Sequence, residues 1–334
     1  MMLRYAGLCL AALCLCAADE PSPPPPETLA PYIAEGAFDP GDFAWMKGRF
    51  ADADEPTKAD VRAIDQWLVQ CIESAKVGVR QELAARGYRD AKLETTLVGP
   101  LVCRQAFMRP NVDATDTYAV FAQEAAAAVP VAEAYLFAVR VAQEAGGPRG
   151  PGLAEQLLAR PLAEQVVRTA VSWGEGMAAG APELTPIARE IVRSRLMGEI
   201  AALDTANALW LKDIVAREGW PEVSAVGEKA ADEAWLLVQH ADHDPVFQLD
   251  ALLLMEPLVA QREVSPRNFA YLYDRVMLKL AGKQRYATQF TCIDGKWGPQ
   301  PIEDEAAVDR LRREAQMETL AENVARMDAS YGRC

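Results

Sequence analysis

The sequence predicts a mainly α-helical protein, in which a helical N-terminal region precedes a C-terminal helical domain that carries one β-hairpin. Apolar residues recur at helical spacing over long stretches such as residues 58–86. Three Ser/Thr/Asp–Pro pairs mark helix starts in the C-terminal half, whereas Asp294-Gly295 is a strong two-residue hairpin turn. The chain has 334 residues, of which 51% are hydrophobic and 25% charged, so it can build about two domains.

The first 18 residues predict a secretory signal peptide. Arg4 is followed by 14 apolar or small residues, Tyr5 to Ala18, which are too few to span a membrane. Small residues at Cys16 and Ala18 fit cleavage after Ala18. The alternative is a lipoprotein acylated on Cys16, which is less favoured because Leu15 stands where a small residue is expected.

A proline-rich linker, residues 19–30, is expected between the signal peptide and the folded part. No later stretch predicts a transmembrane segment in the mature chain. We therefore expect an exported protein, either periplasmic or extracellular. The formal net charge of −14 argues against a nucleic-acid binder and against electrostatic docking on anionic lipid, because both require a basic surface.

Three of the seven cysteines would leave with the signal peptide, and four would remain. An even number of cysteines in an exported chain favours disulfides. The most natural pairing joins Cys71 to Cys103 and Cys292 to Cys334, because each pair then stays within one predicted domain. The alternative is four buried free thiols.

Residues 31–183 are predicted to form a helical domain whose role the sequence leaves open. Further helices are expected over residues 118–144 and 153–172. Pro130 is expected to bend or split the first of these. A segment rich in glycine and proline, residues 146–152, separates the two.

Residues 184–334 are predicted to form the second domain. Its helix starts are marked by Thr185-Pro186, Asp244-Pro245 and Ser265-Pro266. The first of these helices is expected to run to about Glu218, and the last to stop at Gly282. Ser224 is expected to cap a further helix, which lies between Glu218 and Asp244.

The remaining C-terminal elements are a hairpin and a helix. Two strands, residues 285–293 and 296–302, are expected to pair across the Asp294-Gly295 turn. A final helix is expected over residues 305–327.

The two histidines of the chain, His240 and His243, lie three residues apart, and on a continuing helix they share a face. In one interpretation, both bind a divalent metal such as zinc together with a carboxylate such as Asp242. In a second, His240 is a general acid or base that Asp242 orients without a metal. The third is structural: Asp244 caps the next helix, and His240 is a hydrogen-bonded residue at the edge of the core.

Two further polar groups follow. Asp274 and Arg275 interrupt an apolar helix and point about 100° apart, so each is expected to contact a different partner. The segment 284–289 enters the predicted hairpin, where strand alternation would place Tyr286 and Gln289 on opposite faces. Such a polar strand start is either a ligand-binding edge or an exposed edge strand.

No GxSxG nucleophile elbow, HExxH motif, Walker A loop or dinucleotide fingerprint is present in the sequence. Motifs with a known mechanism therefore assign no reaction to the chain.

An ordered set of motifs lies in residues of about 184–327. In order they are Asp204 with Asn207, Gly219-Trp220-Pro221, Gly227, Trp235, Gln239-His240-Ala241-Asp242, Gln248, Asp274-Arg275, Gln284-x-Tyr286-Ala287-Thr288-Gln289 and Pro301-Ile302. On these motifs, the C-terminal part resembles the bacterial domain of unknown function 6624 family. The resemblance implies no reaction, and it gives less weight to His243. It implies one constellation of His240, Asp242, Asp274, Arg275, Tyr286 and Gln289.

The chain departs from the family pattern at two places. Ala287 stands where the motif Q-x-Y-G-T-Q usually has glycine, which bears on any close backbone approach to a ligand there. Gln316-Met317-Glu318 replaces an expected glycine-leucine. The resemblance leaves residues 27–183 unassigned.

The leading hypothesis is an exported, hydrolase-like enzyme with a polar site in the C-terminal domain. The residues with predicted catalytic roles are His240, Asp242, Arg275 and Tyr286, and the predicted ligand contacts are Gln239, Asp274 and Gln289. Arg275 would bind an anionic group of the ligand. The alternatives are a non-catalytic envelope protein that binds a partner or small ligand, with the same residues as a structural network, and a divalent-metal-binding protein.

Overall fold

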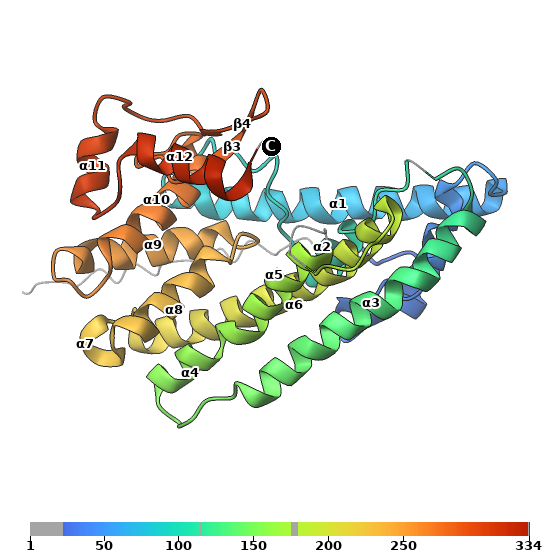
Figure 1. Cartoon of the computed structure of the whole chain (residues 1–334), viewed down its shortest axis with the longest axis horizontal. Coiled ribbons are helices and arrows are strands. Elements are labelled where there is room, and N and C mark those ends of the chain that lie inside the picture. The colour runs from blue at the N-terminus through green and yellow to red at the C-terminus, as the bar shows by residue number, and fades with distance from the viewer. Residues whose placement is uncertain (1–22, 114, 175–179, 333) are drawn as a thin grey trace, which may run out of the picture.

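The computed structural model describes residues 23–113, 115–174, 180–332 and 334. Within these ranges the chain is mainly helical, and its only sheets are two antiparallel strand pairs, which confirms the predicted fold class (Figure 1). The predicted signal peptide, residues 1–18, and its cleavage site lie outside the described residues. So does the cysteine of the lipoprotein alternative.

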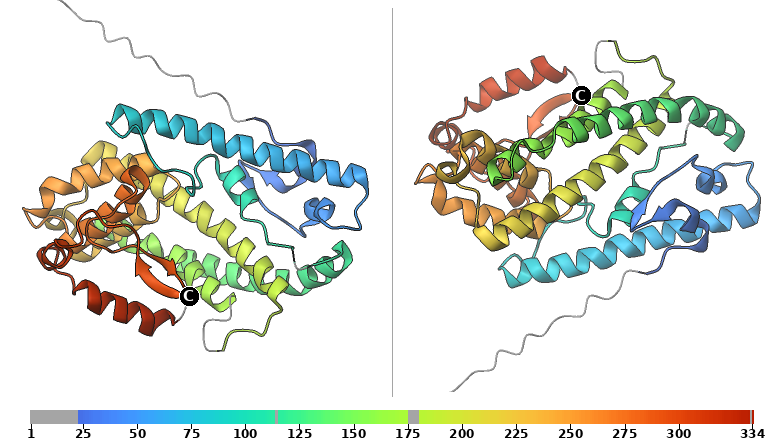
Figure 2. Two further views of the ribbon diagram at one scale, coloured as in Figure 1. Left: turned by 90° about the horizontal axis from the view of Figure 1, so that it is seen from above. Right: turned by 90° about the horizontal axis from the view of Figure 1, so that it is seen from below.

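The first half of the chain supplies the long helices. Its elements are η1 (Glu27–Tyr32), β1 (Ile33–Ala34), β2 (Ala37–Phe38), η2 (Ala44–Arg49), α1 (Glu55–Ala85), α2 (Leu101–Phe107), α3 (Tyr118–Ala145), α4 (Leu153–Ala159), α5 (Pro161–Gly174) and α6 (Pro186–Glu218). Helices α3, α5 and α6 pack against one another, and α2 packs on both α1 and α6. In views from above and from below, α1 and α3 lie on opposite sides of the molecule, with α6 between them (Figure 2).

The second half adds shorter elements at the end where α1 and α6 finish (Figure 1). They are α7 (Val223–Val226), α8 (Glu228–Gln239), α9 (Pro245–Val259), α10 (Pro266–Ala281), β3 (Phe290–Ile293), β4 (Lys296–Pro299), α11 (Val308–Glu314) and α12 (Leu320–Tyr331). Helices α8, α9 and α10 pack together, α4 packs on α8, and α12 contacts β4.

Helix α6 joins two hydrophobic cores. It has 33 residues and is therefore about 50 Å long. Its first half contributes Ile191 and Leu196 to the first core, and its second half contributes Leu211 to the second. Leu83 of α1 also belongs to the second core. The predicted division into residues 31–183 and 184–334 stays a prediction, but both parts share α6 as a common support.

The second half of the predicted linker is part of the folded body. Residues 27–30 belong to η1, and Leu29 is fully buried in the first core. The indole Nε1 of Trp67 donates to the Pro23 carbonyl at 2.9 Å. Because these contacts hold the segment against α1, it is not an extended spacer from Pro23 onward.

The predicted helix boundaries of the C-terminal half are largely confirmed. The side chains of Thr185, Asp244 and Ser265 accept hydrogen bonds from backbone N–H groups three residues further on. Gly282 ends α10 with a left-handed φ of 73°. The prediction for Ser224 is wrong, because it lies inside α7 and a glycine with positive φ separates α7 from α8.

Helix α3 continues through Pro130, so the predicted split does not occur. Proline cannot donate to the carbonyl four residues earlier, which is that of Ala126. Both residues are exposed, so water can satisfy this carbonyl. Among the described helices, α3 alone is long and apolar enough to cross a membrane, and 22% of its most apolar window is buried. This single weak match gives no clear transmembrane segment.

The hairpin turn is confirmed, but its strands are shorter than predicted. Strands β3 and β4 pair antiparallel across Asp294-Gly295, whose φ values of 51° and 78° suit a two-residue turn. Residues 285–289 are not a strand. The backbone N–H groups of Arg285, Tyr286 and Thr288 bond to the buried carboxylate of Asp274 instead of to a neighbouring strand.

The predicted final helix, residues 305–327, is wrong in that it is two helices, α11 and α12. Gln316 has a left-handed φ of 59°, which ends the first helical path. Thr319 then starts α12 with a capping box that includes Glu322.

Both places at which the chain departs from the family pattern have unusual backbone conformations. Ala287 has a φ of 54° and Gln316 one of 59°. Glycine adopts this region without strain, whereas residues with a Cβ do so at a cost of about 1–2 kcal/mol. The left-handed backbone is therefore a local reason for glycine at both positions of the family pattern.

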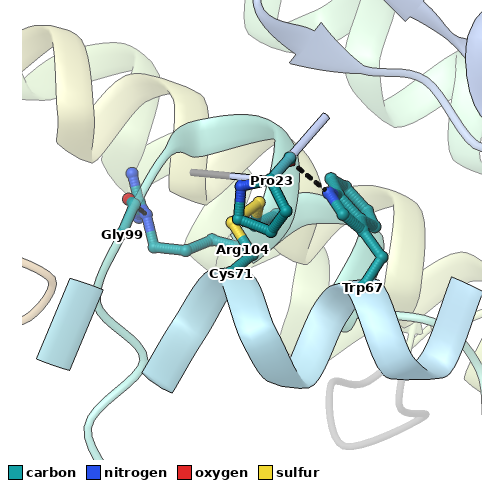
Figure 3. Close-up of a disulfide and its surroundings, with 6 residues drawn as sticks. Pro23, Trp67, Cys71, Gly99 and Arg104 are labelled. Carbon is teal, nitrogen blue, oxygen red and sulfur yellow. Dashed lines mark hydrogen bonds between the residues drawn. A yellow bond between two sulfur atoms is a disulfide. The ribbon is translucent and has the colours of Figure 1, made fainter. Parts of the chain in front are cut away.

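Both predicted disulfides are present. Cys71 of α1 is bonded to Cys103 of α2, and Cys292 of β3 is bonded to Cys334. Cys71 and Cys103 are buried in the first core, where their bond ties α2 to α1 (Figure 3). The two disulfides indicate that the protein folds in an oxidising environment.

We expect Gln316→Gly to raise the free energy of unfolding by about 1 kcal/mol, because Gln316 is exposed and its backbone is left-handed. Urea denaturation measures this change. The matched control is Arg313→Gly in the ordinary helical backbone of α11, which should lower stability by about 1 kcal/mol. A loss of stability in both variants would contradict this account.

Removing the buried disulfide with the double substitution Cys71→Ala and Cys103→Ala should lower the free energy of unfolding by about 3–4 kcal/mol, since the bond closes a loop with a sequence separation of 32. Urea denaturation of the oxidised protein measures the loss of stability. Peptide mapping without reductant checks that Cys71 is bonded to Cys103. Free thiols at both positions in protein from an oxidising compartment would contradict the pairing.

Candidate functional site

A cavity of about 660 Å³ lies where the N-terminal helices meet the C-terminal elements. Its wall is formed by the segment between α1 and α2, by α2, α5 and α6, by the turn between α8 and α9, and by α10. Its charged residues are Lys92, Glu94, Arg104, Arg168, Asp204, Asp242, Arg275 and Lys279, beside His240 and His243. Cationic side chains thus outnumber acidic ones here, although the whole chain has a net charge of −14.

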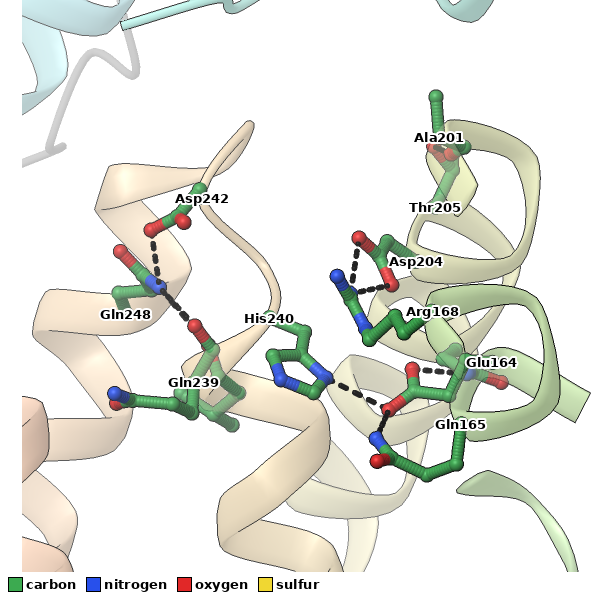
Figure 4. Close-up of polar contacts among 12 residues, drawn as sticks. Glu164, Gln165, Arg168, Ala201, Asp204, Thr205, Gln239, His240, Asp242 and Gln248 are labelled. Carbon is green, nitrogen blue, oxygen red and sulfur yellow. Dashed lines mark hydrogen bonds and ion pairs between the residues drawn. The ribbon is translucent and has the colours of Figure 1, made fainter. Parts of the chain in front are cut away.

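A buried carboxylate contacts His240. Glu164 Oε1 lies 2.7 Å from His240 Nδ1, and Glu164 is fully buried in the first turn of α5 (Figure 4). The amide of Asn207, on α6, donates to the other carboxylate oxygen at 3.0 Å. Since His240 is the C-terminal cap of α8, three helices meet at this carboxylate.

The partners of Glu164 keep its carboxylate ionised. Burial alone would raise the pKa of Glu164, but the contact with His240, followed by Arg168 and Asn207, outweighs burial and lowers this pKa. The hydrogen bond to an ionised carboxylate fixes the proton of a neutral His240 on Nδ1. The second ring nitrogen, Nε2, lies on the side of the imidazole away from Glu164 (Figure 4).

A second carboxylate, Asp204, lies next to this pair. Arg168 Nη2 is 2.8 and 2.9 Å from its two oxygens. Burial, assisted by the nearby Glu164, raises the pKa of Asp204 to about 7 even though Arg168 opposes the rise. Glu164 and Arg168 are four residues apart on α5, and Asp204 and Asn207 three apart on α6, so each pair presents one helix face to the other.

Asp242 belongs to a different cluster on the cavity wall. Its carboxylate accepts hydrogen bonds from Arg275 Nη1 at 2.6 Å and from Lys279 Nζ at 2.5 Å. Burial alone would raise the pKa of Asp242, but the two cations hold it well below its usual range. The buried Gln248 links to the same cluster by accepting from Lys279 at 2.7 Å. The carboxylate that contacts His240 is therefore Glu164, whereas the sequence analysis predicted Asp242 in this position.

His243 lies near a third group, the guanidinium of Arg104. Burial, with Arg104 adding to it, lowers the pKa of His243 to about 4, so this histidine is neutral at pH 7. Asp244 accepts from the Phe247 backbone N–H at 3.0 Å and from Lys212 at 2.7 Å, which confirms the predicted cap.

Asp274 organises the loop before the hairpin. It is fully buried and accepts hydrogen bonds from the backbone N–H groups of Arg285 at 2.7 Å, Tyr286 at 2.9 Å and Thr288 at 2.8 Å. Arg312, also fully buried, donates to the Tyr286 carbonyl at 2.8 Å. These bonds support a structural role for Asp274.

The cavity brings together part of the predicted site. His240, Asp242, His243, Arg275 and Gln289 line it. The other predicted residues, Gln239, Asp274 and Tyr286, are not among its lining residues.

Sequence reasoning missed the residues that complete the site. They are Glu164, Arg168, Arg104 and Lys279. Glu164 and Arg168 have the helical spacing of an ordinary surface pair, which gives no sign of burial. Asp204 and Asn207 were part of the family motif, and they are the signal that could have directed attention to the helix facing them.

The predicted zinc set of His240, Asp242 and His243 stays a prediction. Among the described residues, one ligand atom from each of Glu164, Asp204 and His240 lies within 4.8 Å of the others. Carboxylate and imidazole are suitable zinc ligands. However, Arg168 already forms an ion pair with Asp204, and its positive charge opposes a cation there.

The model of a family of unknown function, DUF6624, matches residues 151–334. The match covers more than half of the chain, and the chain belongs to this family. It begins at residue 151 and not near 184, so it includes the helix that carries Glu164 and Arg168. Arg104 lies before the matched part. No curated protein and no solved structure is significantly similar to the chain.

We expect NMR titration of the two imidazoles to show His243 protonating near pH 4. Arg104→Gln removes a like charge and should raise the pKa of His243 toward 6.5, its usual value. A value unchanged by Arg104→Gln would contradict the proximity of the two groups.

Unfolded His243 takes up its proton near pH 6.5, so its contribution to stability is present above pH 6.5 and is lost as the pH falls to about 4. Over this range, His243→Asn should lose less stability than the wild type, by up to about 3 kcal/mol. Urea denaturation at several pH values measures the difference. Parallel curves for the two proteins would contradict it.

Proposed function

We propose that this protein is a hydrolase-like enzyme in which His240 is the general base and Glu164 orients it. The observation that carries the proposal is the 2.7 Å contact between His240 Nδ1 and the fully buried Glu164, at the wall of a cavity of small-molecule size. A carboxylate bonded to Nδ1–H leaves the lone pair of Nε2 free to accept a proton.

The nucleophile we assign is water. The residues that line the cavity include no serine, and the four described cysteines are bonded in disulfides. In the proposed step, His240 Nε2 takes a proton from a water molecule as its oxygen attacks an electrophilic centre of the substrate. The imidazolium that forms is stabilised by Glu164 and then returns its proton to the leaving group.

The cations of the wall support this reaction class. Hydrolysis of an ester, amide or phosphate develops negative charge on oxygen, which fixed positive charges stabilise in a site that excludes bulk water. Arg168 and Arg275 are both on the wall and each has a buried Nε without a hydrogen-bond partner in the described chain. Arg275 retains the anion-binding role that we predict for it.

A second candidate is divalent-metal binding, favoured by the proximity of Glu164, Asp204 and His240. A zinc ion there would have to displace Arg168 from Asp204 and the proton from Nδ1 of His240. Metal analysis of the purified, untagged protein separates the two candidates, because near-stoichiometric zinc that His240→Ala abolishes would favour the metal site.

We also propose that the protein is exported to the periplasm or the extracellular space. The two disulfides and the predicted signal peptide support this location.

His240→Gln should lower the hydrolysis rate by about 10²-fold or more, with a smaller change in the free energy of unfolding than the 1–3 kcal/mol expected for a broken buried network. The measurement uses p-nitrophenyl esters and p-nitrophenyl phosphate in buffer with EDTA. Arg217→Gln, at an exposed pair with Asp213, is the control and should keep the wild-type rate.

Two outcomes would overturn the proposed function. One is a wild type that hydrolyses none of these probes. The other is a His240→Gln variant that keeps its rate but loses stability, which would favour a non-catalytic protein with a structural network.

A further inference from the structure

Arg104 differs from Arg168, Arg275 and Lys279, the other cations of the cavity wall that are not exposed. Arg168 is paired with Asp204, and Arg275 and Lys279 are paired with Asp242. Arg104 is only 3% exposed, and in the described chain no carboxylate lies within ion-pair distance of it. Asp204 and Asp244 act on its charge only from beyond ion-pair distance, and burial outweighs them, lowering the pKa of Arg104 to about 10.

The hydrogen bonds of Arg104 go to neutral acceptors. Nε donates to the Gly99 carbonyl at 3.0 Å, and Nη2 donates to the Thr205 hydroxyl (Figure 3 shows the first). These two contacts fix the plane of the guanidinium but do not neutralise it. Among the described residues none accepts a hydrogen bond from the third nitrogen, Nη1.

Burying a charge that has no contact ion pair is unfavourable, and a bound ligand of opposite charge would offset that cost. We propose that Arg104 binds an anionic group, a carboxylate or a phosphate, of a small molecule that enters the cavity. This inference rests on the proposed function in one respect: the same molecule would present its reacting bond to His240.

The surroundings of Arg104 favour an oxyanion. Neutral His243 lies close enough to respond to the guanidinium, and it offers an imidazole N–H without a competing charge. Lys92 and Thr95 of the segment between α1 and α2 line the same cavity, and neither is buried. Glu94 is the carboxylate of this segment, and its exposed position lets water screen its charge.

The disulfide contributes to this site. Arg104 follows Cys103 directly, and the bond from Cys103 to Cys71 holds α2 on α1 (Figure 3). A fixed guanidinium loses less freedom when a ligand binds than a mobile one does. Because Arg104 precedes the part matched by the family model, the N-terminal region would give this chain its choice of ligand.

Inorganic phosphate and acetate are the probes, titrated separately into the oxidised mature protein by calorimetry at low ionic strength. We expect one equivalent of one of them to bind with a Kd in the millimolar range or tighter. Arg104→Gln should weaken binding at least about tenfold, because a charge-assisted hydrogen bond is lost. Preference for one probe identifies the anionic group as phosphate or carboxylate.

Arg86→Gln is the matched control, since Arg86 pairs with Asp250 on the surface and binding should be unchanged. Arg104→Lys keeps the charge and should bind the anion more tightly than Arg104→Gln. This difference would show that Arg104→Gln loses binding because the charge is lost, and not because the protein misfolds. In the wild type, the bound anion should also raise the pKa of His243 in NMR titrations.

His240→Gln separates this proposal from the proposed function. If His240→Gln binds the anion but no longer hydrolyses the probes, both the anion site and the proposed function are supported. If it binds the anion and hydrolyses at the wild-type rate, the anion site is supported and the proposed role of His240 is overturned. The anion site is overturned if the wild type binds neither probe saturably, or if folded Arg104→Gln binds as tightly as the wild type.

Discussion

The arrangement of the site depends on the burial of one carboxylate. Glu164 is fully removed from solvent, and an ionised carboxylate is tolerated there only if hydrogen-bond donors surround it. The donors come from His240 at the end of α8 and Asn207 on α6. Helices α5, α6 and α8 are therefore held in one relative position, and the imidazole is held at the cavity wall with them.

The distribution of charge gives the cavity its chemical character. The chain is acidic overall, with a net charge of −14, yet its cavity is lined by more cations than carboxylates. Arg168, Arg275 and Lys279 form ion pairs with Asp204 or Asp242, whereas among the described residues Arg104 forms none. We infer that such a charge distribution favours small anions, which fit into the cavity, over large polyanions, which the net negative charge of the chain repels.

The two halves of the chain have complementary parts in this site. The part that belongs to the DUF6624 family supplies the His240–Glu164 pair and the Asp242 cluster. The N-terminal region supplies the opposite wall, where the Cys71–Cys103 bond ties α2 to α1. The sequence left the role of the N-terminal region open, and the structure shows that this region forms part of the cavity wall.

The sequence by itself determined the features that depend on neighbouring residues. The helical class, the caps at Thr185, Asp244 and Ser265, and the turn at Asp294-Gly295 are set by short-range backbone chemistry. The two disulfides were also predictable, because four cysteines allow few pairings. The sequence predicted His240 as a site residue because it is one of only two histidines, and His240 lines the cavity.

Only the tertiary structure decided which groups meet. Asp242 is two residues from His240 and was the predicted partner, whereas the true partner, Glu164, is 76 residues away on another helix. Sequence spacing reports contacts along one helix but not contacts between helices, which depend on how the two cores pack around α6. For the same reason the loop at residues 284–289, which bonds to Asp274, could not be distinguished from a strand.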